Sequence, residues 1–87
     1  MDLTETMYYT YIAECADATY YTGYTTDIES RAQIHNEGKG AKYTRSRLPV
    51  KIVYTETFAN KSDALKREAA IKRMNRSEKA ALIAAGS

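Results

Sequence analysis

Tyrosine residues gather near the start of the chain, beside its single cysteine and its single histidine. Six of the eight tyrosines lie in the stretch 8–24, and Arg31 and His35 follow it. Phenol and imidazole groups can transfer protons, and a guanidinium can hold two oxygens of a phosphate. Tyrosine is also a common strand residue whose ring packs while its hydroxyl stays at the rim, which is the ordinary alternative for each of them.

The relative position of Tyr11 and Tyr21 depends on the hairpin that the sequence predicts. The residues on both sides of the turn at 16–18 are rich in aromatic and β-branched side chains, so we expect two antiparallel strands. Because side chains alternate along a strand, an odd loop places Tyr11 and Tyr21 on one face, whereas an even loop separates them. Gly23 would let a ligand or a backbone approach the phenols, and a bend that ends the strand is its ordinary alternative.

Arg31 and His35 are four residues apart, which places them one above the other on a helix. Ile28 and Ala32 should face the sheet, so Arg31 and His35 border the buried stripe instead of pointing straight to solvent. A solvated arginine and a surface or capping histidine are the ordinary alternatives. The position of this pair beside the tyrosine face favours a role in catalysis.

Glu68 is out of place in its helix. It falls within the arc bounded by Ala64, Leu65 and Ile71, which should be the buried face. One alternative is a partly exposed carboxylate paired with Lys72 at i+4, which stabilises a helix by only about 0.3–0.5 kcal/mol. The other is a hard oxygen ligand for Mg²⁺, an ion that binds through one or two carboxylates and keeps several waters.

The order of elements indicates an α+β fold, ββαβαα, with a small sheet and helices packed on it. Thr26 and Glu29 form a capping-box pattern that predicts a helix from there to about Gly38. The other expected elements are strands over 7–15, 19–24 and 50–58, a helix from Asn60 or Ser62 to about Met74, and a last helix capped by Asn75 and Glu78.

Length and composition limit the protein class. The chain has 87 residues, 44% of them hydrophobic and 28% charged, which predicts one globular domain over 7–84 with flexible ends at 1–6 and 85–87. No apolar run approaches the roughly 18 residues that cross a bilayer, and the acidic start lacks the apolar region of a signal peptide. Cys15 cannot form an internal disulfide and should be a small buried residue, so we expect a cytoplasmic protein without membrane contact.

A basic segment separates the first helix from the third strand. Residues 38–51 contain no acidic residue, and Tyr43 among them could stack on a base or a sugar. A solvated surface is the ordinary alternative, but clustering beside the tyrosine face favours contact with phosphates. The expected substrate-binding residues are Gly23, Lys39, Lys42, Tyr43, Arg45 and Arg47, with Lys51 at the end of the segment.

The ordered motifs resemble the GIY-YIG nuclease superfamily, and specifically its small stand-alone bacterial members. The matching stretches are "YTY" at 9–11, "YTG" at 21–23, "DIESRAQIHN", "GKGAKYTRSRLPVKIVY" and "ALKREAAIKR", which together cover about 7–83. The resemblance implies a three-stranded antiparallel sheet flanked by helices. It also implies that Tyr11 and Tyr21 are the two motif tyrosines, Arg31 the catalytic arginine and Glu68 the metal ligand, while His35 falls where members carry histidine or tyrosine.

Some positions depart from the family pattern. Tyr9 and Thr10 replace the Gly-Ile of the first motif, and Thr22 replaces the isoleucine of the second, so these positions look structural. Ala18 stands where such hairpins often have glycine. Asn75 lies on the same helix line as Glu68, but a capping role for the last helix is the simpler interpretation.

These residues predict a Mg²⁺- or Mn²⁺-dependent DNA endonuclease with a single metal site on Glu68. Arg31 would hold the non-bridging oxygens, and Tyr21, Tyr11 or His35 would accept the proton from water. The absence of a base-reading module predicts low sequence specificity, and branched, nicked or single-stranded DNA in repair or recombination is the expected substrate class. A protein partner could add specificity. The alternative is a catalytically weak nucleic-acid binding module in which Arg31 and Glu68 form a structural ion pair.

Overall fold

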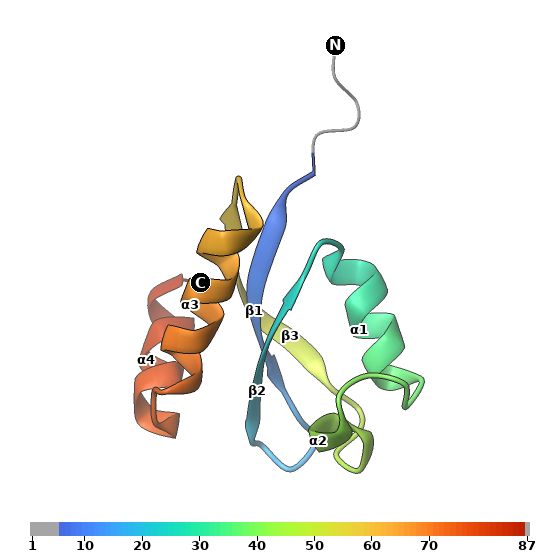
Figure 1. Ribbon diagram of the computed structural model, residues 1–87. Helices are drawn as coiled ribbons and strands as arrows, with labels where there is room; N and C mark the ends of the chain where they lie inside the picture. Colours follow the sequence, from blue (N-terminus) through green and yellow to red (C-terminus); the bar gives the residue numbers. More distant parts are fainter. Residues whose placement is uncertain (1–5, 87) are drawn as a thin grey trace.

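The computed structural model describes residues 6–86 and places a three-stranded sheet between two pairs of helices (Figure 1). The order of elements is the expected one with a short helix added in the basic segment. Helix α4 includes residues 85 and 86, whereas residues 1–5 and 87 of the expected flexible ends lie outside the described residues. The elements are β1 (Tyr8–Glu14), β2 (Tyr20–Thr25), α1 (Ile28–Asn36), α2 (Lys42–Arg45), β3 (Lys51–Phe58), α3 (Lys61–Lys72) and α4 (Arg76–Gly86).

The sheet is antiparallel with strand order β2-β1-β3, so β2 is an edge strand. Residues 15–19 connect β1 to β2, an odd number of residues. Ala13 therefore pairs with Tyr21, and Tyr11 pairs with Gly23. Since side chains two residues apart share a face, the register confirms that Tyr11 and Tyr21 lie on the same face of the sheet.

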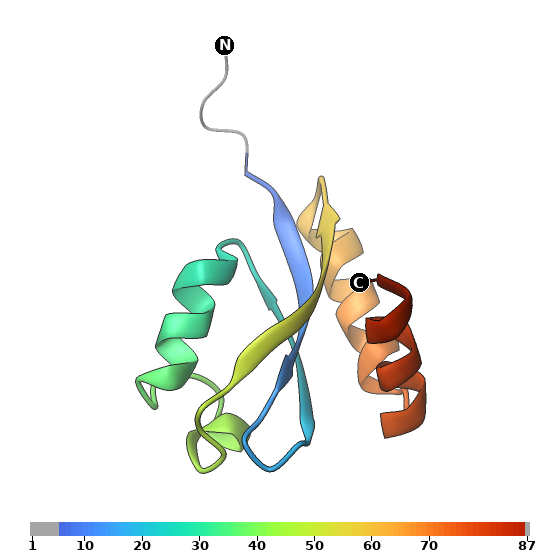
Figure 2. The same cartoon turned by 180° about the vertical axis from the view of Figure 1, so that it is seen from behind.

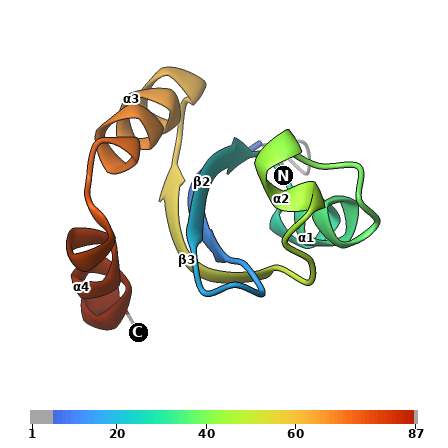
Figure 3. The same ribbon diagram turned by 90° about the horizontal axis from the view of Figure 1, so that it is seen from below.

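Each face of the sheet has its own helices (Figures 2 and 3). On the α1 and α2 side, Tyr11, Ala13, Cys15 and Val50 form the buried cluster, so Cys15 is the small buried residue that the sequence predicts. On the α3 and α4 side, the Thr10 hydroxyl donates to the Ala64 carbonyl at 2.6 Å. The alternation of β1 thus supplies two thin layers of core, as expected for a chain of this size.

The capping residues explain where the helices begin. Asp27, not Thr26, caps α1: its carboxylate accepts from the Ser30 amide, and the helix begins one residue later than the predicted box allows. Asn60 caps α3 by accepting from the Asp63 amide.

The last helix has the predicted reciprocal capping box, in which the Asn75 and Glu78 side chains accept from each other's amides. This contact assigns Asn75 a structural role. Within residues 6–86, no helix combines the length and the apolar character needed to cross a membrane.

Candidate active site

A buried hydrogen bond joins the first motif tyrosine to the histidine of α1. Tyr11 and His35 are each 1% exposed, and the Tyr11 hydroxyl lies 2.8 Å from His35 Nε2. The Tyr11 ring covers Gly23, where an added Cβ would lie 2.5 Å from the phenol carbon and oxygen. Gly23 therefore makes room for the phenol of Tyr11 itself. The sequence indicated that Gly23 leaves space near the phenols, but it did not indicate that the Tyr11 ring fills this space.

Thr44 determines which nitrogen of His35 carries the proton. The Thr44 hydroxyl donates to the Ala41 carbonyl at 2.9 Å, so its oxygen is left to accept from His35 Nδ1 at 3.0 Å. His35 Nε2 is then unprotonated and accepts from Tyr11. Burial, and then the charge of Arg31, lower the pKa of His35, which keeps the imidazole neutral near pH 7.

Two residues of this network were missed from the sequence. Thr44 is an ordinary-looking residue of the basic segment, and no spacing rule connects it with His35. Gly40 packs directly against His35, because a Cβ at this position would collide with Nδ1. The only signal for Gly40 in the sequence was a second glycine, Gly38, two residues before it, and a flexible loop explains that pattern equally well.

Tyr21 is the accessible phenol of the site. Its ring lies 6.3 Å from the Tyr11 ring, 5.5 Å from the His35 ring and 6.3 Å from the Tyr43 ring. Unlike Tyr11 and His35 it is only half-buried, and its hydroxyl makes no hydrogen bond to another described residue. Burial, and then the charge of Tyr21, raise the pKa of Tyr11, so the Tyr11 phenol keeps its proton.

Arg31 brings an unpaired donor to the same place. Among the residues that the structure describes, its Nε is a buried nitrogen without a hydrogen-bond partner. Its charge adds to the lowering of the pKa of His35 and opposes part of the rise in the pKa of Tyr11. A buried donor without an acceptor costs about 1–3 kcal/mol, more for a charged group, so an anion that accepts from Arg31 would be stabilised here.

Glu68 approaches from the other side of the sheet. Its helix, α3, covers the face of the sheet opposite α1 (Figure 3), so Glu68 does not share a face with Tyr11, Tyr21 and the helix that carries Arg31 and His35. The Glu68 charge contributes to the raised pKa of Tyr11. Its carboxylate lies 3.2 Å from Lys72 Nζ, which is the ordinary ion pair that the sequence left open.

The buried arc of α3 is narrower than expected. Ala64 and Ile71 are fully buried, but Leu65 is 39% exposed, so it does not bound the arc. The Glu68 side chain is 17% exposed. The Glu68 carboxylate is therefore partly accessible to solvent, and along the helix it lies between the fully buried Ala64 and Ile71.

The donor set limits what metal the site can hold. Within residues 6–86, no group of three or more histidine, cysteine, aspartate or glutamate side chains could bind an ion together. Glu68 alone fits Mg²⁺ only in the manner of a one-carboxylate site, whose other ligands are waters and substrate oxygens. The single site expected from the sequence is compatible with this chemistry.

The basic segment forms a surface beside Tyr21. Lys39, Lys42 and Arg45 are exposed, and the ring of Tyr43, a residue of α2, stacks on the ring of Tyr21. Arg47 differs from these cations, as its contacts show. It donates to Asp17 at 3.0 Å and to the Tyr43 carbonyl at 2.7 Å, and its guanidinium lies 3.9 Å from the Tyr43 ring centre.

The fold and this arrangement of tyrosines, arginine, histidine and glutamate define a GIY-YIG type domain. The family model described as "GIY-YIG catalytic domain" matches residues 7–81, and the chain belongs to this family.

Similar proteins agree with the assignment. The chain is 54% identical to a UPF0213 protein of Halobacterium salinarum over 76 residues, which cover 87% of this chain and 99% of that protein. A UPF0213 protein of Syntrophus aciditrophicus is 59% identical over 86% of this chain and 87% of its own. The solution structure of the UPF0213 protein BH0048 from Bacillus halodurans is similar with a TM-score of 0.60 and 44% identity, covering 93% of this chain and 87% of that one. Membership in this family supports nuclease activity in general, on a nucleic-acid substrate.

Proposed function

We propose that this protein is a Mg²⁺-dependent endonuclease that hydrolyses phosphodiester bonds in DNA, with Mn²⁺ as an alternative ion. The observation that carries the proposal is the buried Nε of Arg31, which has no acceptor within residues 6–86. A non-bridging phosphate oxygen would supply that acceptor once the partly exposed side chain of Arg31 turns its Nε to the ligand, and the planar guanidinium can bind two such oxygens at once. Charge that builds up on these oxygens during attack would then be stabilised by this cationic donor.

Tyr21 is proposed as the group that takes the proton from the attacking water. Three candidates for this role follow from the sequence, and two of them, Tyr11 and His35, are buried and bonded to each other. Only Tyr21 combines partial exposure with a hydroxyl that no described residue occupies.

Tyr11 and His35 are proposed as the rigid support of the reacting groups. Because the pKa of Tyr11 is raised and that of His35 is lowered, both stay neutral, and the shared proton stays on the phenol. Their bond fixes the Tyr11 ring against which Tyr21 packs. Thr44 acts through His35 and is a positioning residue.

Glu68 is proposed as the protein ligand of the metal. A divalent cation, when bound, polarises the phosphate and stabilises the leaving oxygen. For this role Glu68 must exchange its contact with Lys72 for the ion. The exchange is inexpensive because the Lys72 side chain is 54% exposed and such i, i+4 pairs stabilise a helix by only about 0.3–0.5 kcal/mol.

The alternative binding module is less well supported. It assumed a structural ion pair between Arg31 and Glu68, whereas Glu68 pairs with Lys72 and the Nε of Arg31 stays unpaired in the described part of the chain. A structural ion pair would give both the Arg31 guanidinium and the Glu68 carboxylate a partner in each other. The observed arrangement leaves one donor for a ligand, which favours a site that binds an anion.

The basic surface supports DNA as the substrate. Lys39, Lys42 and Arg45 are exposed in the segment whose Tyr43 packs against Tyr21, and phosphate contacts of this kind carry no sequence information. We therefore propose a nuclease of low sequence specificity that acts on branched, nicked or single-stranded DNA in repair or recombination. The lone buried thiol of Cys15 is compatible with action in a reducing cytoplasm.

The test is a panel of plasmid, single-stranded and branched DNA incubated with and without Mg²⁺. Wild-type protein should cut at least one substrate, and Glu68→Gln should not, while Glu37→Gln, an exposed carboxylate of equal charge, should cut normally. In parallel, Mn²⁺ should perturb the amide resonances around Glu68 in the wild type only. Metal-independent cutting, or equal perturbation of Glu68→Gln, would contradict the assignment.

A further inference from the structure

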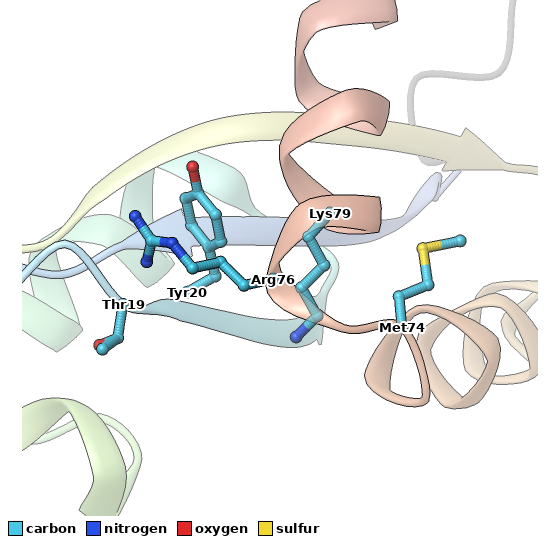
Figure 4. A pocket seen from close by; sticks show the side chains of 5 residues that line it. All are labelled: Thr19, Tyr20, Met74, Arg76 and Lys79. Carbon is cyan, nitrogen blue, oxygen red and sulfur yellow. The ribbon is translucent and has the colours of Figure 1, made fainter.

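A small cavity lies on the α4 side of the sheet, away from the buried Tyr11–His35 pair. It has a volume of about 180 Å³ and is lined by Thr19, Tyr20, Met74, Arg76 and Lys79 (Figure 4). Tyr20 precedes Tyr21 in β2, so the two rings project to opposite faces of this edge strand. Since one water occupies roughly 30 Å³ of liquid, the cavity has room for a group the size of a phosphodiester and part of its sugar.

Arg76 is held at the cavity by its uncharged neighbours. Its guanidinium lies 5.1 Å from the Tyr20 ring centre and donates to the carbonyl of Ala18. Figure 4 shows its side chain running from α4 towards Tyr20. An arginine has five N–H donors in a fixed fork, so most of them remain for a ligand while the aromatic contact fixes the group in place.

Lys79 adds a second cation on the next turn of α4. Burial, and then the charge of Lys72, lower the pKa of its ammonium group. In residues 6–86 neither Lys79 nor Arg76 forms an ion pair. The nearest acidic residue of α4, Glu78, accepts from the Asn75 amide and is engaged in the capping box. Glu14, which pairs with Tyr20 across the strands, shares this face of the sheet but forms no ion pair with either cation in the described residues. Two positive charges therefore share a cavity with no carboxylate in contact with them, and an anion would supply that contact.

Lys72 connects this cavity with the candidate metal ligand. It lies 3.2 Å from Glu68, and its charge also acts on Lys79. A strand bound at Arg31 and Glu68 would therefore reach the cavity within a short distance along the β2 edge. Aromatic and apolar lining, here Tyr20 and Met74, suits the sugar and base of an unpaired nucleotide better than a free inorganic anion.

We propose that the cavity of Tyr20, Arg76 and Lys79 binds a phosphodiester of single-stranded DNA that continues from the candidate active site. The proposal rests on the proposed function and adds to it the substrate class. Helix α2 lies on one side of the sheet, and α4, which carries Arg76 and Lys79, lies on the other (Figure 3). A strand that contacts both must bend around the edge strand β2, which an unpaired strand does at lower cost than a duplex.

The test measures the affinity of the full chain for a labelled single strand and for a duplex of the same sequence, without metal. Arg76→Gln and Lys79→Gln should each weaken single-strand binding about fivefold at 0.1 M salt and lower the salt slope by about 0.7. Lys66→Gln removes the same charge from an exposed position of α3 and should change neither. Melting curves of all variants identify any loss of folded protein.

The proposal is overturned if both variants bind the single strand as Lys66→Gln does, or if single-strand and duplex binding fall equally. It is also overturned if the wild type does not bind the single strand. Cleavage in Mg²⁺ separates it from the proposed function. A wild type that cuts DNA, combined with variants that bind normally, removes the cavity alone. Specific loss of binding with no cleavage of any substrate removes the nuclease activity alone.

Discussion

Replacing Thr44 by valine should destabilise the protein and disturb the proposed support of the site. Thr44 and His35 are 0% and 1% exposed, and the hydroxyl both accepts from His35 Nδ1 and donates to Ala41. Valine removes the acceptor, so a buried N–H is left without a partner at a cost of about 1–3 kcal/mol. For a domain of this size each kcal/mol lowers the melting temperature by roughly 4–8 °C.

Thr22→Val is the matched control for this prediction. Thr22 is also buried, at 2% exposure, but its hydroxyl has no hydrogen-bond partner in the described residues. The same chemical change should therefore stabilise the protein at this position, by about 1 kcal/mol, because it removes an unsatisfied polar group. Thr44→Ser, which keeps the hydroxyl, should retain more of the stability than Thr44→Val.

The assay combines thermal unfolding with ¹⁵N spectra of the His35 ring. The wild type should show Nδ1 protonated and Nε2 unprotonated, and Thr44→Val should lose this single tautomer. In single-turnover cleavage Thr44→Val should lower the rate more than DNA affinity. If both valine variants shift the melting temperature in the same direction, or if the tautomer of His35 is unchanged in Thr44→Val, the hydrogen-bond network described here is wrong.

Two other predictions concern acid stability and DNA binding. Because the pKa of His35 is lowered on folding, the unfolded chain binds a proton that the folded chain does not, and stability should fall as pH drops below about 6.5, by up to about 1.4 kcal/mol per pH unit. Urea unfolding at several pH values measures this slope, and its persistence in His35→Gln would assign it to other groups. Lys42→Ala and Arg45→Ala should each weaken DNA affinity and reduce the salt slope by roughly 0.7–0.9. Salt-dependent binding measures this change, and slopes equal to that of the wild type would remove α2 from the interface.

Local rules predicted much of the fold. The sequence placed Tyr11 and Tyr21 on one face only for an odd loop, and the structure has one; given that loop, alternation along a strand fixes the shared face. The reciprocal capping box of Asn75 and Glu78 is also present as predicted, because both partners lie within one helical turn and their contact depends on local geometry alone. The predicted cap of α1 was wrong by one residue. Thr26 and Asp27 are both good capping residues, and residue type alone does not decide which of two neighbours caps the helix.

Contacts between distant elements were not predictable in this way. The pairing of Arg47 with Asp17 joins residues that are far apart in sequence, so composition suggested a free cation where the structure has an engaged one. Glu68 was identified from its place on a helix wheel, but the face of the sheet that α3 covers is decided by packing. The prediction that Leu65 is buried was wrong for the same reason, because a helical wheel gives directions around one helix and does not locate the elements that pack against it.

The most direct test of the proposed function is single-turnover cleavage by Arg31→Lys, which keeps the charge and changes its geometry. If the unpaired Nε of Arg31 binds a phosphate oxygen, the variant should bind DNA with near wild-type affinity and cut it about 10²-fold or more slowly. Its melting temperature, measured on the same sample, should stay close to that of the wild type. Cleavage at the wild-type rate would contradict the role of Arg31, and a large fall in melting temperature without a change in rate would show that this residue supports the fold instead.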